Sequence, residues 1–446
     1  MANTYLTHTN SGTGSYQKST FSAWVKRSSL GTIQTMWNNQ VQAGVNQVRI
    51  EFDAADKIYL YGEEAGGYAL RALTTSVYRD TSAWYNIVVA IDTTQGTASD
   101  RIKLYVNGVQ VTLTFSTTPA VNANLRMNYN STPVYVGSSA TAYYFNGSMS
   151  HVHWIDGTAY PASTFGSVDA TSGIWKINTS PSVTYGTNGF FILKDGNTIT
   201  DQSGESNNFS LGGGTLTNTE DCPSNNYPSV NINAGKAADY LNSTGLRYGN
   251  TQINQAGSPG VFISTLANTT GKYYWEMLID AVGYTTQGVI AYDALVQNGS
   301  VIYLYTPATG YGYVYTGNKG NNNSQVSYGD SYTSGDYISV AFDQTNGSIW
   351  FAKNGVWQNS ATTAEIGAGT TTNAAYSSMP TNGNVYAAGF GLDNNAVSSI
   401  NYGNGTFGTT TLGTTYSPTV GDTGAKFKYN IIPTGFTAIS TKGYNA

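Results

Sequence analysis

Cysteine and charged residues are scarce in this chain of 446 residues. Cys222 is the only cysteine, which excludes a disulfide within the chain and a zinc site built from thiolates. Charged residues make up 10% of the chain, against roughly 25% in an ordinary soluble domain. The net charge is −5, so no basic surface for nucleic acid is expected. Hydroxyl and amide side chains must therefore supply most of the polar groups that hydrate the surface.

Long apolar runs are also missing. No stretch approaches 18 apolar residues, so we expect no membrane-spanning helix and no insertion into a membrane. The first ten residues, MANTYLTHTN, have neither the basic region nor the apolar region of a signal peptide. The sequence thus predicts synthesis in the cytoplasm without export.

Glycine and tyrosine are abundant instead, with 51 and 35 copies. Aromatic residues favour a pleated, half-buried surface, and glycine and asparagine favour turns. A hydrophobic content of 40% is enough to form a core, which excludes a disordered chain. The composition therefore predicts an all-β protein.

Short runs that alternate between apolar and polar residues recur along the whole chain and are bounded by Gly, Asn, Asp or Pro. No helical periodicity extends beyond two turns. Many short strands at regular spacing are typical of sandwiches and barrels. The predicted strands include residues 20–27, 46–52, 57–61, 84–92, 101–108, 272–280, 287–293, 336–343 and 348–355.

One unit of two strands occurs in both halves of the chain. In the first half, a hydrophobic strand ends at Asp92 and the next strand closes on Asn107-Gly108. In the second half, the corresponding strand ends at Asp343 and the next closes on Asn354-Gly355. Asn-Gly is the strongest short hairpin signal, because both residues tolerate a positive φ. The repetition indicates two sandwiches of related design.

Three sets of motifs resemble known proteins. The first half resembles a laminin-G-like domain of the concanavalin A-type lectin/glucanase class, through STFSAWVKR, WYNIVVAIDTTQG, IKLYVNG and FNGSMSHVHWIDG. The second half is similar to SPRY domains, through GKYYWEMLI, GVIAYD, YGYVYTGNKGNNN, GDYISVAFDQTNGSIWFAKNG, INYGNGTF and PTGFTAIS. The intervening run, from IDGTAYPASTFG to DCPSNNYPSVN, looks like a set of phage virion proteins, especially of marine phages, in which the two domains follow one another.

This resemblance implies two jelly-roll-type antiparallel β-sandwiches, concanavalin A-like over residues 1–170 and SPRY-like over 236–446. We predict a connector with short strands over 171–235, because residues 203–235 are rich in Gly, Ser, Asn and Pro. A functional hinge is the alternative interpretation of that stretch.

In SPRY domains, loops at one end of the sandwich form the binding surface. The corresponding candidates here are tyrosines and asparagines beside glycine-rich turns. An exposed tyrosine row at 311, 313 and 315 could stack on sugar rings or anchor a protein, and packing within the sheet is the alternative. The candidate ligand-binding residues are Tyr303, Tyr305, Tyr311, Tyr313, Tyr315, Asn321, Asn322 and Asn323.

Catalytic and metal-binding patterns are weak. Glu51-Phe-Asp53-Ala-Ala-Asp56 approaches the carboxylate pattern of glucanases, but a turn between two strands explains it as well. His151 and His153 could supply half of a zinc site, or a polar face of a strand. Asp92, Asp100 and Asp343 are single candidate calcium ligands, and no loop with clustered carboxylates supports them. We therefore expect no catalytic residue, no metal and no cofactor.

These observations predict a non-enzymatic phage virion surface protein, either a capsid decoration or a short fibre that acts as an adhesin. Because its first β motif begins by residue 20, with no shaft before it, the sandwich itself must dock on other virion proteins. We expect a homo-oligomer, such as a trimer, that binds a glycan or a protein receptor on the host surface. The alternatives are a polysaccharide depolymerase that uses Glu51 and Asp53, and a purely structural cement protein or tail fibre component.

Overall fold

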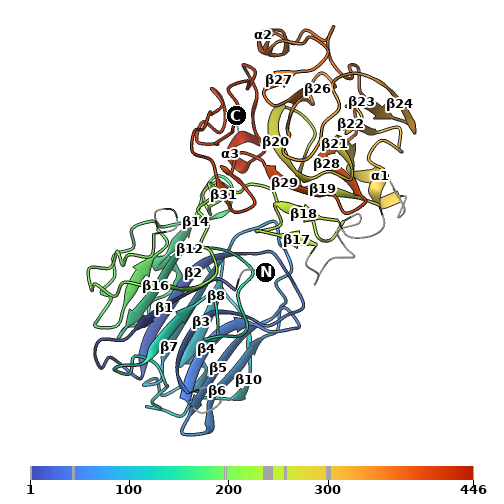
Figure 1. The fold of residues 1–446 in the computed structure, drawn as a ribbon. Helices are drawn as coiled ribbons and strands as arrows, with labels where there is room; N and C mark the ends of the chain where they lie inside the picture. Colours follow the sequence, from blue (N-terminus) through green and yellow to red (C-terminus); the bar gives the residue numbers. More distant parts are fainter. Residues whose placement is uncertain are drawn as a thin grey trace. The chain divides into compact units, whose positions relative to one another are not determined.

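The computed structural model describes residues 3–42, 46–194, 196, 198–234, 245–255, 259–297 and 303–444. The chain is nearly all β and forms two compact units, Met1–Asn218 and Thr219–Ala446 (Figure 1). The division falls inside the Gly/Ser/Asn-rich stretch, whereas the predicted boundary at 235 and 236 lies outside the described residues. No helix among the described residues has the length and apolar character needed to cross a membrane.

Unit 1 is a sandwich of two antiparallel sheets. The larger has the order β10 (Leu113–Thr117), β6 (Gly67–Thr74), β5 (Ile58–Glu64), β4 (Asn46–Phe52), β3 (Gln34–Gln42), β11 (Pro133–Val136), β1 (Tyr5–Thr9) and β16 (Ser210–Gly213). The smaller has the order β15 (Phe190–Ile192), β12 (Gly147–Asp156), β2 (Lys18–Arg27), β7 (Tyr85–Asp92), β8 (Ile102–Val106) and β9 (Val109–Gln110). The hairpin of β13 (Gly166–Val168) and β14 (Trp175–Ile177) is separate from both.

The core of unit 1 lies between its two sheets. Along β4, the alternate residues Val48, Ile50 and Phe52 are at most 1% exposed, as a strand with one buried face requires. Trp37 on β3 stacks on Trp154 on β12 with ring centroids 3.9 Å apart, and this pair joins the two sheets. The strands β14, β15 and β16, from the predicted connector, all belong to this unit.

Unit 2 also has two large sheets. The first has the order β17 (Leu246–Arg247), β18 (Gln252–Asn254), β29 (Val397–Asn401), β20 (Lys272–Ala281), β25 (Tyr337–Asp343), β26 (Ser348–Lys353) and β27 (Val356–Trp357), and β32 (Thr437–Ala438) pairs with β20. The second has the order β19 (Gly260–Asn268), β28 (Tyr386–Asp393), β21 (Tyr284–Ala291), β22 (Gly310–Val314), β23 (Asn318–Asn321) and β24 (Ser324–Ser327). The remaining elements are the hairpin of β30 (Thr406–Phe407) and β31 (Thr410–Thr411) and the short helices α1 (Tyr292–Gln297), α2 (Thr363–Gly367) and α3 (Thr441–Tyr444).

The two predicted Asn-Gly turns are confirmed and have the same hydrogen bonds. Asn107 and Asn354 adopt φ values of 48° and 49°, and the following glycines have φ values of 80° and 81°. The Oδ1 atom of Asn107 accepts the amide of Asn86 at 2.8 Å, and that of Asn354 accepts the amide of Tyr337 at 2.8 Å. Each asparagine therefore fastens its turn to the start of the neighbouring strand, β7 for Asn107 and β25 for Asn354.

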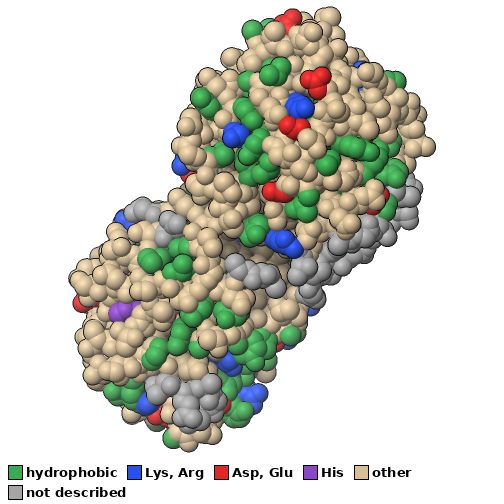
Figure 2. All heavy atoms as spheres, in the orientation of Figure 1, with side chains coloured by type: hydrophobic (Ala, Val, Ile, Leu, Met, Phe, Trp, Pro, Cys, Tyr) green, Lys and Arg blue, Asp and Glu red, His purple; other side chains and the backbone are tan. Residues whose placement is uncertain are grey.

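Low charge is visible on the surface. In Figure 2, the red and blue side chains are few and scattered, and uncharged polar atoms and backbone make up most of the visible face. Uncharged polar groups hydrate this face, as the composition predicts.

Candidate functional site

Three of the predicted tyrosines meet in unit 2 and form, with two further residues, the tyrosine cluster: Tyr284, Tyr303, Tyr305, Tyr315 and Gln325. The rings of Tyr303 and Tyr305 are almost parallel, with centroids 5.7 Å apart. Tyr284 packs against Tyr303 at 4.9 Å and against Tyr315 at 5.3 Å. Tyr284, Tyr303 and Tyr315 are half-buried residues, and Tyr305 is buried.

Hydrogen bonds fix the polar ends of the tyrosine cluster. The hydroxyl groups of Tyr284 and Tyr305 lie 2.7 Å apart. The Nε2 atom of Gln325, on the edge strand β24, donates to Tyr305 at 2.8 Å and to Tyr284 at 3.1 Å. Burial, together with the hydrogen bond to Tyr305, raises the pKa of Tyr284 well above its usual range, so this phenol is neutral at physiological pH. The cluster thus offers neutral donors and acceptors beside partly exposed aromatic rings.

A row of glycines explains why the tyrosine-bearing segment lies on the sheet. Gly389, Gly288, Gly312 and Gly320 are paired in register across β28, β21, β22 and β23. A Cβ atom on Gly320 would lie 2.7 Å from the ring of Tyr305, and one on Gly389 would lie 2.5 Å from Leu304 Cδ1. Only a strip without side chains can accept these two residues, so the glycines position the cluster.

Tyr311 and Tyr313 do not form the exposed row expected from the sequence. Tyr313 is 0% exposed and Tyr311 is 7% exposed. Tyr313 stacks on Phe351 of the facing sheet at 5.4 Å, and Tyr311 packs against Tyr376 at 5.0 Å. Alternation correctly places both rings on one face of β22, but this face is the inner one.

Two of the three asparagines, Asn321 and Asn323, bind the segment 303–310 that carries two of the cluster's tyrosines. Asn321 donates from Nδ2 to the carbonyl groups of Ala308 and Gly310 at 2.8 and 2.9 Å. Asn322 and Asn323 form the exposed turn between β23 and β24, with φ values of 48° and 56°. The amide of Asn323 donates to the carbonyl of Tyr305 at 2.9 Å. Asn321 therefore has a structural role, while the other two asparagines are exposed.

Sequence reasoning missed Tyr284 and Gln325. Neither belongs to a recognisable motif, and both reach the cluster only through strand pairing. The available signal was the glycine spacing: Gly288, Gly312 and Gly320 each interrupt a strand, which indicates close approach by another segment.

In unit 1, the carboxylates of the glucanase-like pattern have separate partners. Glu51 on β4 is 2% exposed, accepts the hydroxyl of Thr35 at 3.0 Å and lies 3.6 Å from Arg49 Nε. Burial raises the pKa of Glu51, against the opposing effect of Arg49. Asp53 accepts the amides of Ala55 and Lys57 at 2.9 and 2.8 Å, as a turn residue does.

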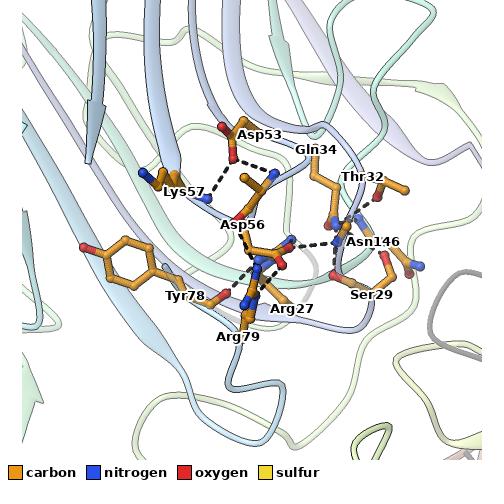
Figure 3. Close-up of polar contacts among 12 residues, drawn as sticks. Arg27, Ser29, Thr32, Gln34, Asp53, Asp56, Lys57, Tyr78, Arg79 and Asn146 are labelled. Carbon is orange, nitrogen blue, oxygen red and sulfur yellow. Dashed lines mark hydrogen bonds and ion pairs between the residues drawn. The ribbon is translucent and has the colours of Figure 1, made fainter. Parts of the chain in front are cut away.

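Asp56 is the centre of a buried ion-pair group (Figure 3). Its carboxylate accepts hydrogen bonds from Arg27 Nη2 at 2.9 Å, from Arg79 Nε at 2.8 Å and from the amide of Gly31 at 2.8 Å. Burial alone would raise the pKa of Asp56, but these hydrogen bonds and charges outweigh it and leave the pKa below its usual value. The turn that the sequence suggested is thus closed by a charged network.

The two histidines on β12 have structural partners. The ring of His153 is 2% exposed, stacks on Phe191 at 3.9 Å and lies within 2.9 Å of the Tyr185 hydroxyl. Burial lowers the pKa of His153 well below its usual value. His151, at φ 48°, sits in an irregularity of the pairing with β2 and contacts Ser150 Oγ at 2.8 Å.

The three aspartates considered for calcium each lie near a lysine. Asp92, Asp100 and Asp343 are 3.4, 3.1 and 3.4 Å from Lys18, Lys103 and Lys272. Within the described part of the chain, no three His, Cys, Asp or Glu residues are grouped so that they could hold a metal ion.

Comparison with known proteins matches one domain family within each unit. Residues 1–163 match the concanavalin A-like lectin/glucanases superfamily, and residues 272–404 match the SPRY domain. Comparison with curated proteins gives no match.

Solved structures that match part of this chain include two from animals. The SPRY domain of human HERC1 has 17% identity and a TM-score of 0.29, and the match covers 39% of this chain and 96% of that one. The native heptameric SAP-like pentraxin from Limulus polyphemus has 11% identity and a TM-score of 0.28, with coverage of 39% and 81%. The sheets agree with the two family matches: residues 1–163 lie in the first β unit and are similar to concanavalin A-like domains, and residues 272–404 lie in the second and are similar to SPRY domains.

Proposed function

We propose that this chain is a non-enzymatic binding protein of a phage virion surface, either a capsid decoration or a short fibre. It docks on other virion proteins and uses the tyrosine cluster to bind a glycan or protein of the host surface. The resemblance of the central motif run to phage virion proteins supports the location. The tyrosine cluster is the observation that carries the binding role.

Three features of the tyrosine cluster suit a saccharide. The half-buried rings present flat apolar surface that is already ordered, so little conformational entropy is lost on binding. The hydroxyls of Tyr284 and Tyr305 and the amide of Gln325 lie beside these rings and can pair with sugar hydroxyls. The glycine row keeps the segment close to the sheet, which makes the platform rigid.

Replacing Tyr303 with alanine should weaken binding of a glycan identified on a host-glycan array by about 5- to 30-fold, or on the order of 1–2 kcal/mol. Tyr303 is chosen because it is half-buried and its loss leaves Tyr305 on the glycine row. Titration calorimetry with the full chain measures the change. Tyr248→Ala, which removes a tyrosine that is 42% exposed elsewhere in unit 2, is the matched control and should bind normally. Equal affinity of Tyr303→Ala and the unmodified chain would remove the tyrosine cluster from the proposal.

One observation favours the depolymerase as a second candidate: Glu51 is buried and its pKa is raised, as a general acid requires. Against it, Asp53 is engaged by two backbone amides of its turn. We expect no shortening of host polysaccharide after incubation with the protein, as judged by size-exclusion chromatography. Cleavage that disappears in Glu51→Gln, while Glu205→Gln still cleaves, would establish the enzyme instead.

The cement-protein alternative predicts a different pair of results. No glycan would bind above background, and capsids without the protein would lose thermal stability. Binding on the array together with unchanged capsid melting would exclude it.

A further inference from the structure

Asn-Gly pairs occur eight times in this chain. In such a pair the backbone amide of the glycine can attack the asparagine side chain, because a residue without a Cβ atom lets other atoms approach its backbone closely. How fast this happens depends on how the structure holds the asparagine. Seven pairs are described, at residues 107, 146, 188, 346, 354, 382 and 404, and the pair at 298 lies outside the described residues.

Hydrogen bonds hold the asparagine side chain in five of the described pairs. The Oδ1 atoms of Asn107 and Asn354 each accept a backbone amide at 2.8 Å. Asn188 and Asn404 are 1% and 4% exposed, and the Nδ2 atom of each donates to a neighbouring oxygen. Asn346 is exposed, but its Nδ2 atom donates to a carboxylate at 2.9 Å. An attack in any of these pairs must first break such a hydrogen bond.

Backbone contacts fix the pair at 146. The amide of Asn146 donates to Gln34 Oε1 at 3.2 Å, and its carbonyl accepts the amide of Ser28 at 2.8 Å. Gly147 is the first residue of β12 and pairs with Arg27 on β2. The chain is therefore held on both sides of the peptide bond at which the attack would occur.

The pair at 382 differs from the other six. Asn382 and Gly383 are both exposed, at the tip of the turn before β28. Within the described part of the chain, the side chain of Asn382 has no hydrogen-bond partner, and neither has the backbone amide of Gly383. A Cβ atom added at Gly383 would meet nothing within 4 Å. Both reacting groups are therefore free to rotate toward one another.

The base of the same loop is held in place. The carbonyl of Pro380 accepts Asn384 Nδ2 at 2.9 Å and the hydroxyl of Tyr386 at 3.1 Å. Gln344 Nε2 donates to the carbonyl of Asn384 at 3.4 Å. The tip can therefore change its conformation while β28 keeps its place in the sheet.

We propose that Asn382 is a site of spontaneous deamidation, which converts it through a cyclic imide to aspartate and isoaspartate. The amide nitrogen of Gly383 loses its proton to hydroxide and attacks Cγ of Asn382. A bond forms between these two atoms, the bond from Cγ to Nδ2 breaks, and Nδ2 leaves as ammonia with a proton from water. Water then adds to one of the two imide carbonyls and opens the ring.

The product carries one carboxylate more than the chain that was synthesised. Its net charge changes from −5 to −6, on a surface where charges are few. Isoaspartate also lengthens the main chain at the tip, while the hydrogen bonds at the base of the loop remain. The protein thus acquires negative charge with age at one defined position, whatever ligand the tyrosine cluster binds.

The test stores the full chain in mildly alkaline buffer at body temperature and follows each pair over time. Digestion with pepsin at acidic pH stops the reaction, and mass spectrometry of the peptides distinguishes asparagine, aspartate and isoaspartate. We expect the pair at 382 to convert at least about tenfold faster than those at 107 and 354, whose hydrogen bonds must break first. The rate should rise with pH, because hydroxide removes the proton from the attacking amide.

The pairs at 107 and 354 are matched controls in the same molecule, since each asparagine is also followed by glycine. In urea, where the fold is lost, all pairs should convert at similar rates. Asn382→Gln should suppress the charge change and keep the thermal melt, because the longer side chain closes a less favourable ring.

Three results would each overturn the proposal. The first is a rate at Asn382 in the folded chain no higher than at Asn107 and Asn354. The second is a ratio of these rates that is the same in the folded and the urea-unfolded chain, because the fold would then have no part in it. The third is aspartate at 382 without isoaspartate, because direct hydrolysis of the side chain gives aspartate alone.

Discussion

Replacement of Asp56 with asparagine is expected to cost unit 1 about 3–5 kcal/mol of unfolding free energy. The Arg27 side chain is 0% exposed, and Asp56 is its carboxylate partner at 2.9 Å. Asparagine can still accept the Gly31 amide, but it leaves the guanidinium charge inside the protein without compensation. A buried charge whose partner is removed is far more costly than an absent pair.

Urea denaturation monitored by hydrogen exchange of peptides from β2 and β4 measures this loss within unit 1. Arg79→Gln is the matched control: its side chain is 58% exposed, so it should cost less than about 1 kcal/mol although it contacts the same carboxylate. The double variant Arg27→Met/Asp56→Asn should regain part of the stability, because no charge is then buried. A loss below about 1 kcal/mol in Asp56→Asn would show that solvent compensates Arg27.

The second large effect is a decline in the stability of unit 2 as the pH rises from 4.5 to about 7, caused by Glu276. This carboxyl group on β20 is 0% exposed. It accepts the amides of Lys428 and Tyr429 at 2.7 and 3.0 Å and the hydroxyl of Tyr274 at 3.0 Å. Burial raises the pKa of Glu276 from 4.5 to about 7, because the hydrogen bonds offset only part of the desolvation. Glu276 thus holds the C-terminal segment on the sheet at an electrostatic cost.

The direction of this pH dependence follows from the number of protons that the folded and unfolded states bind. Between pH 4.5 and 7 the folded state keeps a proton on Glu276 that the unfolded chain has released, so stability falls as the pH rises. The difference in pKa corresponds to about 3 kcal/mol over this window. Above pH 7, Glu276 is ionised in both states and contributes no further slope.

Glu276→Gln should remove this slope, since glutamine does not titrate. At pH 5 it should be less stable than the unmodified chain by about 1–3 kcal/mol, because its amide nitrogen faces a donor. Urea titrations at pH 5, 6 and 7, with hydrogen exchange of β20 peptides, provide both values. Glu365→Gln, at the start of α2, removes one surface carboxylate and should keep the slope. A slope that persists in Glu276→Gln would assign it to another group.

Local signals predicted the strands and their turns. The strand predicted over residues 46–52 has the same bounds as β4. The Asn-Gly turns at 107 and 354 have the positive φ values that this residue pair favours. Strand ends are predicted less well, as the strand expected over residues 287–293 shows. The observed strand begins earlier, at Tyr284, and ends at Ala291, and α1 begins at the next residue. Strand ends depend on pairing partners that a single segment does not reveal.

The candidate site could be predicted only in part. The structure brings Tyr303, Tyr305 and Tyr315 together, whereas the exposed row expected for Tyr311 and Tyr313 is wrong, and the alternative of packing within the sheet holds for these two residues. The alternation of side chains along a strand indicates which residues share a face, but it does not indicate which of the two faces packs against the core. Burial of Tyr313 against Phe351 is decided by the partner sheet, which is formed by distant residues.

The sequence by itself determined that this protein is all-β, has little charge and contains a repeated Asn-Gly hairpin, because these properties depend on composition and on neighbours along the chain. Only the tertiary structure decided where chemistry is concentrated. Pairing of four strands aligned the glycines, and two of them accept Leu304 and Tyr305. Such alignments depend on register between strands far apart in sequence, and register is set by the packing of the whole sheet.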